Sequence, residues 1–351
     1  MVSLMNDKIK IAISPYNADR PDEYIERMVE TIRLVYPNTT VEGFPRFRDL
    51  LSLKDKDFVW LNWFEDLPSR GRIKNFLLKE FTLLCMKLMR VKVIVTFHNK
   101  EPHDSGNTIW DKLLFRHNFK NADRIIILSS DSNYVLKEKF GKKILNKTML
   151  IPPPTYICKP KCDKGNKNRF SILFFGHLRP YKNIEMIYEL ARRFNDIGFT
   201  IAGNAMDARY EAYLKNEAKD ISNITLISRY ITADEVDALI DSHSLILLPY
   251  DVKSTLNSGV VIHAICKHIN TIVPAIGTVN QFKNKDKIFS YIYDSPEDHF
   301  QKLMDILAFA KDEYENNFEK FEERIDMLYE EMMENRTPLA LSHKIKELLQ
   351  I

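Results

Sequence analysis

The sequence predicts an α/β protein built from two doubly wound domains. Short apolar, β-rich runs alternate with amphipathic helical runs, a pattern typical of parallel sheets covered by helices. The alternation stops at one lysine-rich segment and then starts again. The chain has 351 residues, and at roughly 150 residues per domain this length favours two domains. We therefore expect one sheet in each half of the chain.

The first half, residues 1–156, contains four expected strands. The runs VKVIVTF and RIIIL are apolar throughout, as strands buried on both faces must be. Helical periodicity separates the strands, and a proline lies near the start of the first helix. The expected strands cover residues 9–14, 58–62, 91–97 and 124–128, and the expected helices cover residues 21–35, 72–89, 109–119 and 130–140. This half is Rossmann-like.

The segment ICKPKCDKGNKNR, residues 157–169, follows three turn-forming prolines, and we expect it to link the domains. The alternation restarts over residues 170–325 with the strand runs FSILFFG, FTIAG, ITLIS and SLILLP. Helices are expected between and after them, at residues 184–194, 208–218, 233–242 and 258–267. We expect the last stretch, residues 326–351, to form helices that pack back towards the N-terminal domain.

The composition excludes several classes of protein. With 45% hydrophobic and 28% charged residues, the chain can bury a large core. No apolar run approaches the roughly 20 residues that span a bilayer, and the N-terminus lacks the apolar core of a signal peptide. Four scattered cysteines fit a reducing compartment, so a cytoplasmic protein is expected. The net charge of +3 does not indicate nucleic-acid binding.

Cations follow the first expected strand of the second half. That strand ends at Gly176, and Arg179 and Lys182 lie in the turn before the next helix. Ligands of open parallel sheets bind beyond the carboxyl ends of the strands. Two cations beside a helix N-terminus can hold a diphosphate, although the same spacing also fits cations on a solvated surface.

The sequence around these cations resembles the donor-sugar domain of GT-B glycosyltransferases, especially of the family 4 type. The resemblance lies in GHLRPYKN, TIAG, LLPY, NSGV and NTIVP with Gly277, which occur in the same order between residues 168 and 280. It implies a GT-B fold, in which two Rossmann-like domains face each other across a cleft. It further implies an N-terminal acceptor-binding domain, a C-terminal domain for a nucleotide-sugar donor, and no cofactor.

The resemblance also implies which residues bind the donor. Arg179 and Lys182 would contact the diphosphate, and the backbone N–H groups of Ser258 and Gly259 would lie beneath it. These groups would neutralise the leaving diphosphate, so no metal is required. Tyr230 would either stack on the nucleotide base or pack in the core. The expected donor-binding residues are Gly176, Arg179, Lys182, Tyr230, Tyr250, Thr255, Asn257, Ser258, Gly259 and His263.

The sequence departs from the retaining branch of family 4 at two positions. That branch carries two glutamates eight positions apart, one near the donor sugar and one near the ribose. Thr255 and His263 occupy these positions here, which leaves the anomeric outcome open. His263 can reach a ribose hydroxyl through a ring nitrogen, or it can be a hydrogen-bonded core residue.

Candidate catalytic residues lie in the N-terminal half. VTFHN and EPHD are similar to the strand-end histidine region of the same enzymes. His98 follows an apolar strand directly, and an imidazole suits the deprotonation of an acceptor hydroxyl. The alternative is that it only caps local backbone. His103 and Asp104 form a second candidate base.

The loop after the first strand lacks the adjacent glycines that approach the donor phosphates in many relatives. It is therefore expected to bind the acceptor through Tyr16 and Asn17, with Tyr16 offering a stacking face to a sugar.

No metal site is expected. Asp55 and Asp57 match an Asp-x-Asp pattern, but they lie in a lysine-rich turn. Cys158 and Cys162 lack a second ligand pair at zinc spacing.

The run of residues 69–90 places cations among apolar residues that cover more than one helical face. A helix packed against the sheet explains most of this pattern. The cations beside Phe76 and Phe81 also suit an anionic membrane surface, where lipid-linked acceptors reside. Peripheral contact with the inner face of a membrane is therefore one expectation.

The sequence thus indicates a glycosyltransferase of the hexosyltransferase type. It would move a sugar from a nucleotide-sugar donor to a glycan or lipid-linked glycan acceptor, in surface polysaccharide or lipid-linked glycan biosynthesis. Two alternatives are a non-catalytic GT-B subunit that binds a nucleotide or a partner, and a GT-B nucleotide-sugar epimerase.

Overall fold

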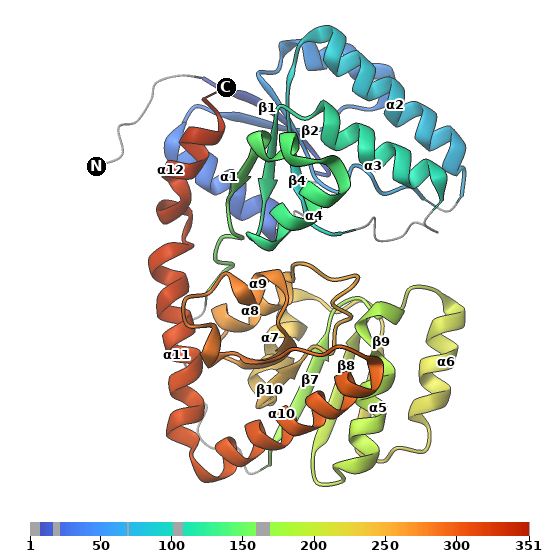
Figure 1. The fold of residues 1–351 in the computed structure, drawn as a ribbon, viewed down its shortest axis with the longest axis vertical. Coiled ribbons are helices and arrows are strands. Elements are labelled where there is room, and N and C mark those ends of the chain that lie inside the picture. The colour runs from blue at the N-terminus through green and yellow to red at the C-terminus, as the bar shows by residue number, and fades with distance from the viewer. Residues whose placement is uncertain (1–7, 17–21, 69, 101–107, 159–168, 351) are drawn as a thin grey trace. The chain divides into compact units, whose positions relative to one another are not determined.

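The computed structural model describes residues 8–16, 22–68, 70–100, 108–158 and 169–350. The chain divides into two compact units. The first unit contains residues 1–156 and 335–351, and the second contains residues 157–334. Each unit has one six-stranded sheet, and all paired strands are parallel (Figure 1). The predicted architecture of two doubly wound α/β domains is confirmed.

The sheet of the first unit has the strand order β2-β1-β3-β4-β5-β6. The sequence predicted β1, β3, β4 and β5 but not β2 or β6, which are short strands at the two edges and are only partly buried. Without a fully apolar run, neither carries the signal of a buried strand. The strands are β1 (Lys10–Ser14), β2 (Thr40–Gly43), β3 (Phe58–Leu61), β4 (Lys92–Phe97), β5 (Arg124–Ile127) and β6 (Thr148–Leu150). The helices are α1 (Glu23–Val35), η1 (Phe47–Asp55), α2 (Arg72–Met89), α3 (Ile109–Asn121), α4 (Asp131–Phe140), η2 (Lys142–Lys147) and α12 (Pro338–Leu348).

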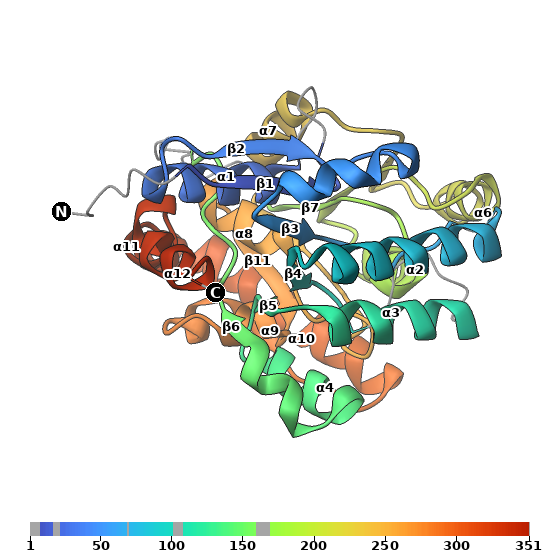
Figure 2. The same cartoon turned by 90° about the horizontal axis from the view of Figure 1, so that it is seen from above.

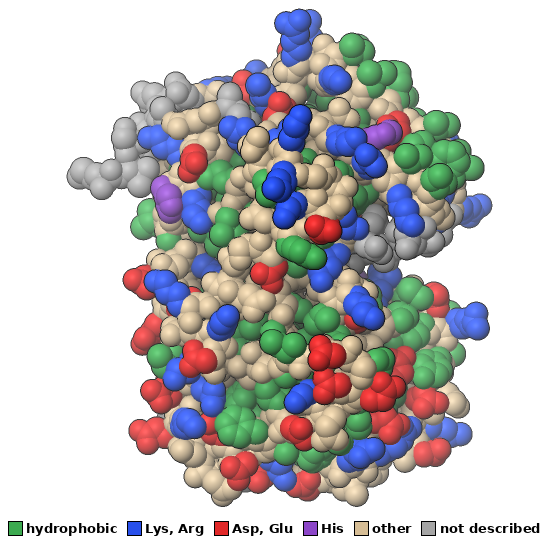
Figure 3. Space-filling view, viewed as in Figure 1, with side chains coloured by type: hydrophobic (Ala, Val, Ile, Leu, Met, Phe, Trp, Pro, Cys, Tyr) green, Lys and Arg blue, Asp and Glu red, His purple; other side chains and the backbone are tan. Residues whose placement is uncertain are grey.

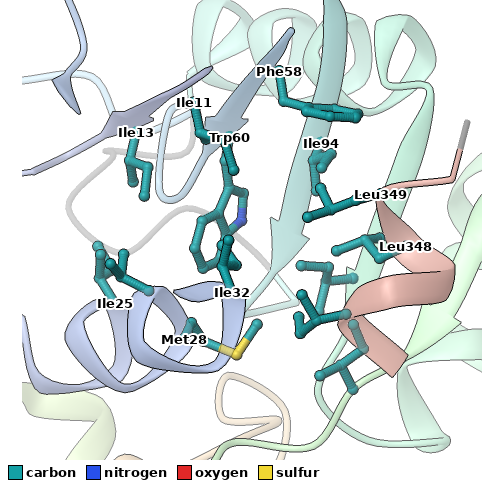
Figure 4. Close-up of a cluster of buried hydrophobic side chains, with 14 of the residues drawn as sticks. Ile11, Ile13, Ile25, Met28, Ile32, Phe58, Trp60, Ile94, Leu348 and Leu349 are labelled. Carbon is teal, nitrogen blue, oxygen red and sulfur yellow. The ribbon is translucent and has the colours of Figure 1, made fainter. Parts of the chain in front are cut away.

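Alternation along the strands assigns each face of this sheet to different helices. Trp60 and Ile94 point towards α1 and join a buried cluster with Met28 (Figure 4). One position further along each strand, side chains point to the opposite face. There Phe97 of β4 packs edge-on against Phe119 of α3. Figure 2 shows α1 and α12 on one side of the sheet and α2 and α3 on the other.

The C-terminal helix α12 belongs to the first unit and packs against α1. Ile345, Leu348 and Leu349 are buried in the same cluster as Trp60 (Figure 4). The preceding helix α11 (Phe318–Asn335) is continuous and lies almost entirely in the second unit. The division therefore falls between residues 334 and 335, whereas the sequence placed it between 325 and 326. The chain leaves α11 only where Thr337 caps the first turn of α12.

The sheet of the second unit has the strand order β12-β11-β10-β7-β8-β9. Its first strand, β7, lies between β10 and β8, so the direction of chain winding reverses between β7 and β10. Ligands of open parallel sheets bind at such switch points, beyond the carboxyl ends of the strands. The strands are β7 (Ser171–Phe175), β8 (Gly198–Gly203), β9 (Ile224–Ser228), β10 (Leu245–Leu247), β11 (Asn270–Pro274) and β12 (Phe289–Tyr291). The helices are η3 (Pro180–Lys182), α5 (Ile184–Arg193), α6 (Ala208–Ala218), α7 (Ala233–Ser242), α8 (Gly259–Cys266), α9 (Gly277–Asn280), η4 (Lys285–Lys287), α10 (Pro296–Asn316) and α11.

Within the described ranges, no helix combines the length and the apolar character needed to cross a membrane.

Candidate functional site

The candidate site begins at the carboxyl end of β7. The strand is buried up to Phe175 and ends in Gly176, whose φ of 120° is rarely adopted by residues with a side chain. A Cβ built on Gly176 would lie 3.3 Å from Nζ of Lys182 and 3.9 Å from Val260 in the first turn of α8. Gly176 thus lies where β7, η3 and the N-terminus of α8 converge.

A second glycine brings β8 against the same turn. A Cβ on Gly203 would lie 1.8 Å from the carbonyl oxygen of Gly176, far inside contact distance. The Gly176 N–H donates to Ala202, and the Leu178 N–H donates to Asn204. The glycine of the TIAG motif therefore permits close approach of two backbones, which holds the turn after β7 in place.

Lys182 is the central side chain of the site. It is only 8% exposed, and its Nζ lies 5.8 Å from the ring centroid of Phe174 and 5.4 Å from that of Tyr250. Among the residues that the structure describes, no acidic side chain forms an ion pair with Lys182. Burial, together with the positive charge of Arg179, lowers the pKa of Lys182 to about 8. Lys182 is therefore not a solvated surface cation, which was the alternative interpretation of its position in the sequence.

The turn after β7 is tied to the loop after β10, across the switch point. Asn183 donates from Nδ2 to the carbonyl oxygen of Pro249 at 2.8 Å, and the Asp251 N–H donates to Tyr181. Arg179 is half-buried in the same turn, two residues before Tyr181. The two loops therefore carry Arg179, Lys182 and Tyr250 to one edge of the sheet.

The loop after β10 leads into α8 and presents its N-terminus. Tyr250 is buried, and its hydroxyl lies 3.4 Å from Oγ of Ser258. The Ser258 N–H donates to Oγ1 of Thr278 at 2.9 Å. In this structure Thr278 is therefore the partner of the Ser258 N–H, and a contact of this N–H with a diphosphate stays a prediction. Gly259 begins α8 and is exposed, so the N-terminus of α8 is accessible at this edge of the sheet.

Two residues that replace the glutamates of the retaining branch, Thr255 and His263, lie in the loop after β10 and on α8. Thr255 is buried, and its Oγ1 has no hydrogen-bond partner among the described residues. His263, on α8, is half-buried and approaches the ring of Phe175 at 5.6 Å in an edge-on arrangement. Asn257 is half-buried between them in the chain. The described structure thus places neutral or weakly basic groups where the resemblance led us to look for carboxylates.

Tyr230 lies apart from these residues, after the edge strand β9. Its side chain is 71% exposed, so the alternative that it packs in the core is excluded. The neighbouring Arg229 pairs with Glu235 and helps to fix the loop that carries Tyr230.

His98 directly follows β4 in the first unit, as the sequence predicted, but it is well packed. It is 7% exposed and stacks on Trp63 with ring centroids 4.0 Å apart. Tyr24 meets it edge-on at 5.3 Å, and its Nε2 lies 3.1 Å from Oδ1 of Asn62. Asn62 and Trp63 follow β3 as His98 follows β4, and this shared strand-end position was the signal that could have identified them.

The other predicted residues of the first unit are described only in part. Tyr16 is partly buried and packs against the cluster around Trp60. Asn17, His103 and Asp104 lie outside the described residues. Asp57 accepts a hydrogen bond from the Lys10 N–H at 2.8 Å, which gives it a structural partner. Within the described ranges, no cluster of three His, Cys, Asp or Glu side chains is placed to hold a metal ion.

The two doubly wound units have the GT-B fold, which they share with glycosyltransferases of known structure. HepE from Anabaena, solved with UDP and glucose, has a TM-score of 0.72 at 12% identity, over 97% of this chain and 99% of HepE. Sucrose-phosphate synthase from Thermosynechococcus elongatus has a TM-score of 0.70 at 13% identity, over 97% of this chain and 98% of that chain.

A curated glycosyltransferase is also similar to this chain in sequence. GDP-mannose:glycolipid 4-beta-D-mannosyltransferase from Xanthomonas campestris pv. campestris is 22% identical over 257 residues. The match covers 71% of this chain and 70% of that protein. No protein-family model matches the sequence.

We predict that Lys182→Met stabilises the protein at pH 7. The folded state holds the pKa of Lys182 at about 8, below its ordinary value, so burying the ammonium costs stability below pH 8. Stability from this group rises as the pH increases from about 8 towards the ordinary value. Removing the charge should raise the free energy of unfolding at pH 7 by up to about 3 kcal/mol, measured by chemical denaturation.

The control is Lys302→Met, at an exposed position of α10, which should change stability by less than about 0.5 kcal/mol. The gain from Lys182→Met should shrink between pH 7 and pH 9. A loss of stability at pH 7 would show that the buried ammonium is compensated by its surroundings.

Proposed function

We propose that this protein is a glycosyltransferase that moves a sugar from a nucleotide-sugar donor to an acceptor hydroxyl. The observation that carries the proposal is the buried Lys182, which has no acidic partner in the described structure and lies beside Arg179 and the start of α8. A buried cation of this kind is stabilised by a bound anion. The donor diphosphate supplies that anion at the position where ligands of doubly wound sheets bind.

In this mechanism, charge develops on the diphosphate as the bond to the sugar breaks. Lys182, Arg179 and the first-turn amides of α8 would stabilise that charge, because they are already oriented before the reaction. We therefore propose that transfer is independent of a metal ion and that no cofactor is used. Thr255, Asn257, His263, Tyr250 and Tyr230 complete the proposed donor site.

The acceptor is proposed to be a glycan or lipid-linked glycan, in surface polysaccharide or lipid-linked glycan biosynthesis. Support comes from the Xanthomonas relative, which by its name transfers mannose from GDP-mannose to a glycolipid. We propose that the protein works in the cytoplasm at the inner face of a membrane, that His98 acts on the acceptor hydroxyl, and that the loop with Tyr16 and Asn17 binds the acceptor.

Donor binding is tested with Arg179→Ala. Loss of one charge-assisted contact to the diphosphate should weaken UDP or GDP binding by about 1.5 to 3 kcal/mol, roughly 10- to 150-fold. Isothermal titration calorimetry measures the Kd of the nucleotide that binds the unmodified protein. Arg192→Ala is the matched control, because Arg192 lies on α5 in the same unit and pairs with Glu189 at the surface. An unchanged Kd for Arg179→Ala would refute the diphosphate site.

Metal independence is tested in the transfer reaction itself. The purified protein is incubated with UDP- and GDP-sugars and a glycolipid acceptor, with and without EDTA, and the products are identified by mass spectrometry. We expect transfer at equal rates in both, since side-chain cations and helix amides neutralise the leaving group. Activity that EDTA abolishes and manganese restores would refute metal independence. An epimerised donor without transfer would instead identify an epimerase, and binding without turnover would identify a non-catalytic subunit.

The role of His98 is tested with His98→Gln, which preserves much of the side-chain volume between Trp63 and Tyr24. Loss of a general base or of a transition-state hydrogen bond should lower kcat by at least about 100-fold. The melting temperature and the donor Kd should change little. His343→Gln, at an exposed position of α12, is the control. Normal turnover, or a loss of activity that follows unfolding, would assign His98 to packing alone.

A further inference from the structure

Helix α2 exposes a long row of large apolar side chains. Five of them recur at helical spacing along its outer side, and two more come from the neighbouring helix η1, where Phe47 contacts Phe81 with ring centroids 5.6 Å apart. Their exposed fractions range from 49% to 82%. We name this surface the apolar stripe; it consists of Phe47, Leu51, Ile73, Leu77, Phe81, Leu84 and Leu88.

The apolar stripe is not the side by which α2 packs on its own unit. Phe76, Leu83 and Met86 are buried on the other side of the helix and anchor it. Packing against the sheet, which the sequence suggested for this helix, therefore accounts for the buried residues Phe76, Leu83 and Met86 but not for the apolar stripe. An exposed apolar row of this length on a folded domain marks a surface that binds another phase or molecule.

Exposed cations border the apolar stripe on both sides. At 3.6 residues per turn, Lys74 and Lys87 lie on opposite flanks of the row that runs from Ile73 to Leu88. The single acidic residue of α2, Glu80, is paired with His117, and η1 carries two exposed aspartates, of which Asp49 pairs with Arg48. Figure 3 shows the hydrophobic side chains over α2 with Lys and Arg around them. The exposed cations of η1, α2 and their flanks are Arg46, Arg48, Lys54, Arg70, Lys74, Lys87 and Arg90.

Positive charge gathers further in a cavity at the C-terminal end of α2. The cavity measures about 450 Å³ and is lined by four cations, Lys87, Arg90, Lys92 and Lys120. The Asp123 carboxylate also lines it and accepts a hydrogen bond from the Val93 N–H at 2.8 Å. Lys87 lines the cavity and also flanks the apolar stripe, so the cationic end of α2 adjoins the stripe.

We propose that the apolar stripe docks on an anionic lipid bilayer. Leucine, isoleucine and phenylalanine side chains would enter the boundary between headgroups and acyl chains, while the flanking cations contact lipid phosphates. A protein partner fits this surface less well, because lysine is depleted at protein interfaces and is abundant here. The bilayer contact deepens the proposed function by naming a docking surface, and it is measured without donor or acceptor, so the two proposals can fail separately.

The test is co-sedimentation of the full chain with liposomes of phosphatidylcholine, alone or mixed with phosphatidylglycerol. We expect binding to the mixed liposomes that weakens with salt, because surface attraction is screened over about 8 Å at physiological ionic strength. The double variant Leu84→Glu with Leu88→Glu should lower the partition coefficient at least about tenfold. The variant Lys87→Glu with Arg90→Glu should lower it by about fivefold or more for each cation and reduce its salt dependence.

The matched control is Ile292→Glu with Leu339→Glu, which adds the same charge at two exposed apolar positions that do not belong to the apolar stripe. This control variant should bind liposomes nearly as well as the unmodified chain. All variants should have the melting temperature of the unmodified chain. Equal binding to neutral and anionic liposomes, or equal loss in the control, would overturn the proposal. A third outcome would also overturn the proposal: the chain does not bind anionic liposomes, and sedimentation velocity shows a dimer. If Leu84→Glu with Leu88→Glu then dissociates this dimer, the apolar stripe is a self-association surface.

Discussion

The candidate site depends on one buried ammonium group, which has no acidic partner among the residues that the structure describes. Lys182 lies over the rings of Phe174 and Tyr250, which attract a cation more weakly than a carboxylate does. Its lowered pKa is the physical sign of this incomplete compensation. The surrounding fold must supply the stability that this residue removes, as is common at functional sites.

The position of that ammonium follows from close backbone packing at the carboxyl edge of the sheet. Gly203 can touch the Gly176 carbonyl only because it has no side chain, and Gly176 leaves room for Nζ of Lys182. Asn183 then fastens the turn to the loop after β10. The chain has only ten glycines, and two of them lie at this contact. Within the described part of the chain, the positive charge is thus positioned by backbone geometry and not by a salt bridge.

The sequence predicted the strands that are apolar throughout, because burial on both faces leaves a clear signal. It did not predict the short edge strands β2, β6 and β12 or the inner strand β11, whose apolar runs are at most three residues long. It placed Arg179 and Lys182 correctly in the turn after β7, but spacing gives position along the chain and not depth. The burial of Lys182 depends on Tyr250, which is distant in sequence and is brought near by the order of β7 and β10.

Because sequence spacing does not give burial or distant contacts, it also did not predict which side of α2 is exposed or which residue binds the Ser258 N–H. The helix is apolar on more than one face, so periodicity alone could not separate the anchoring side with Phe76 from the exposed side with Phe81. The Ser258 N–H is bound by Thr278, whose position depends on the turn after β11.

The absence of carboxylates at positions 255 and 263 agrees with the electrostatics of the site. A carboxylate within ion-pair distance of Lys182 would restore its pKa and stabilise the unliganded protein. It would also compete with a diphosphate for the ammonium. Under the proposed function, the phosphate oxygens would become the partner that raises the pKa of Lys182, and donor binding would be coupled to proton uptake above pH 8. A site of this kind is least stable when it is empty, and its affinity for the anion contains the free energy that the empty site lacks.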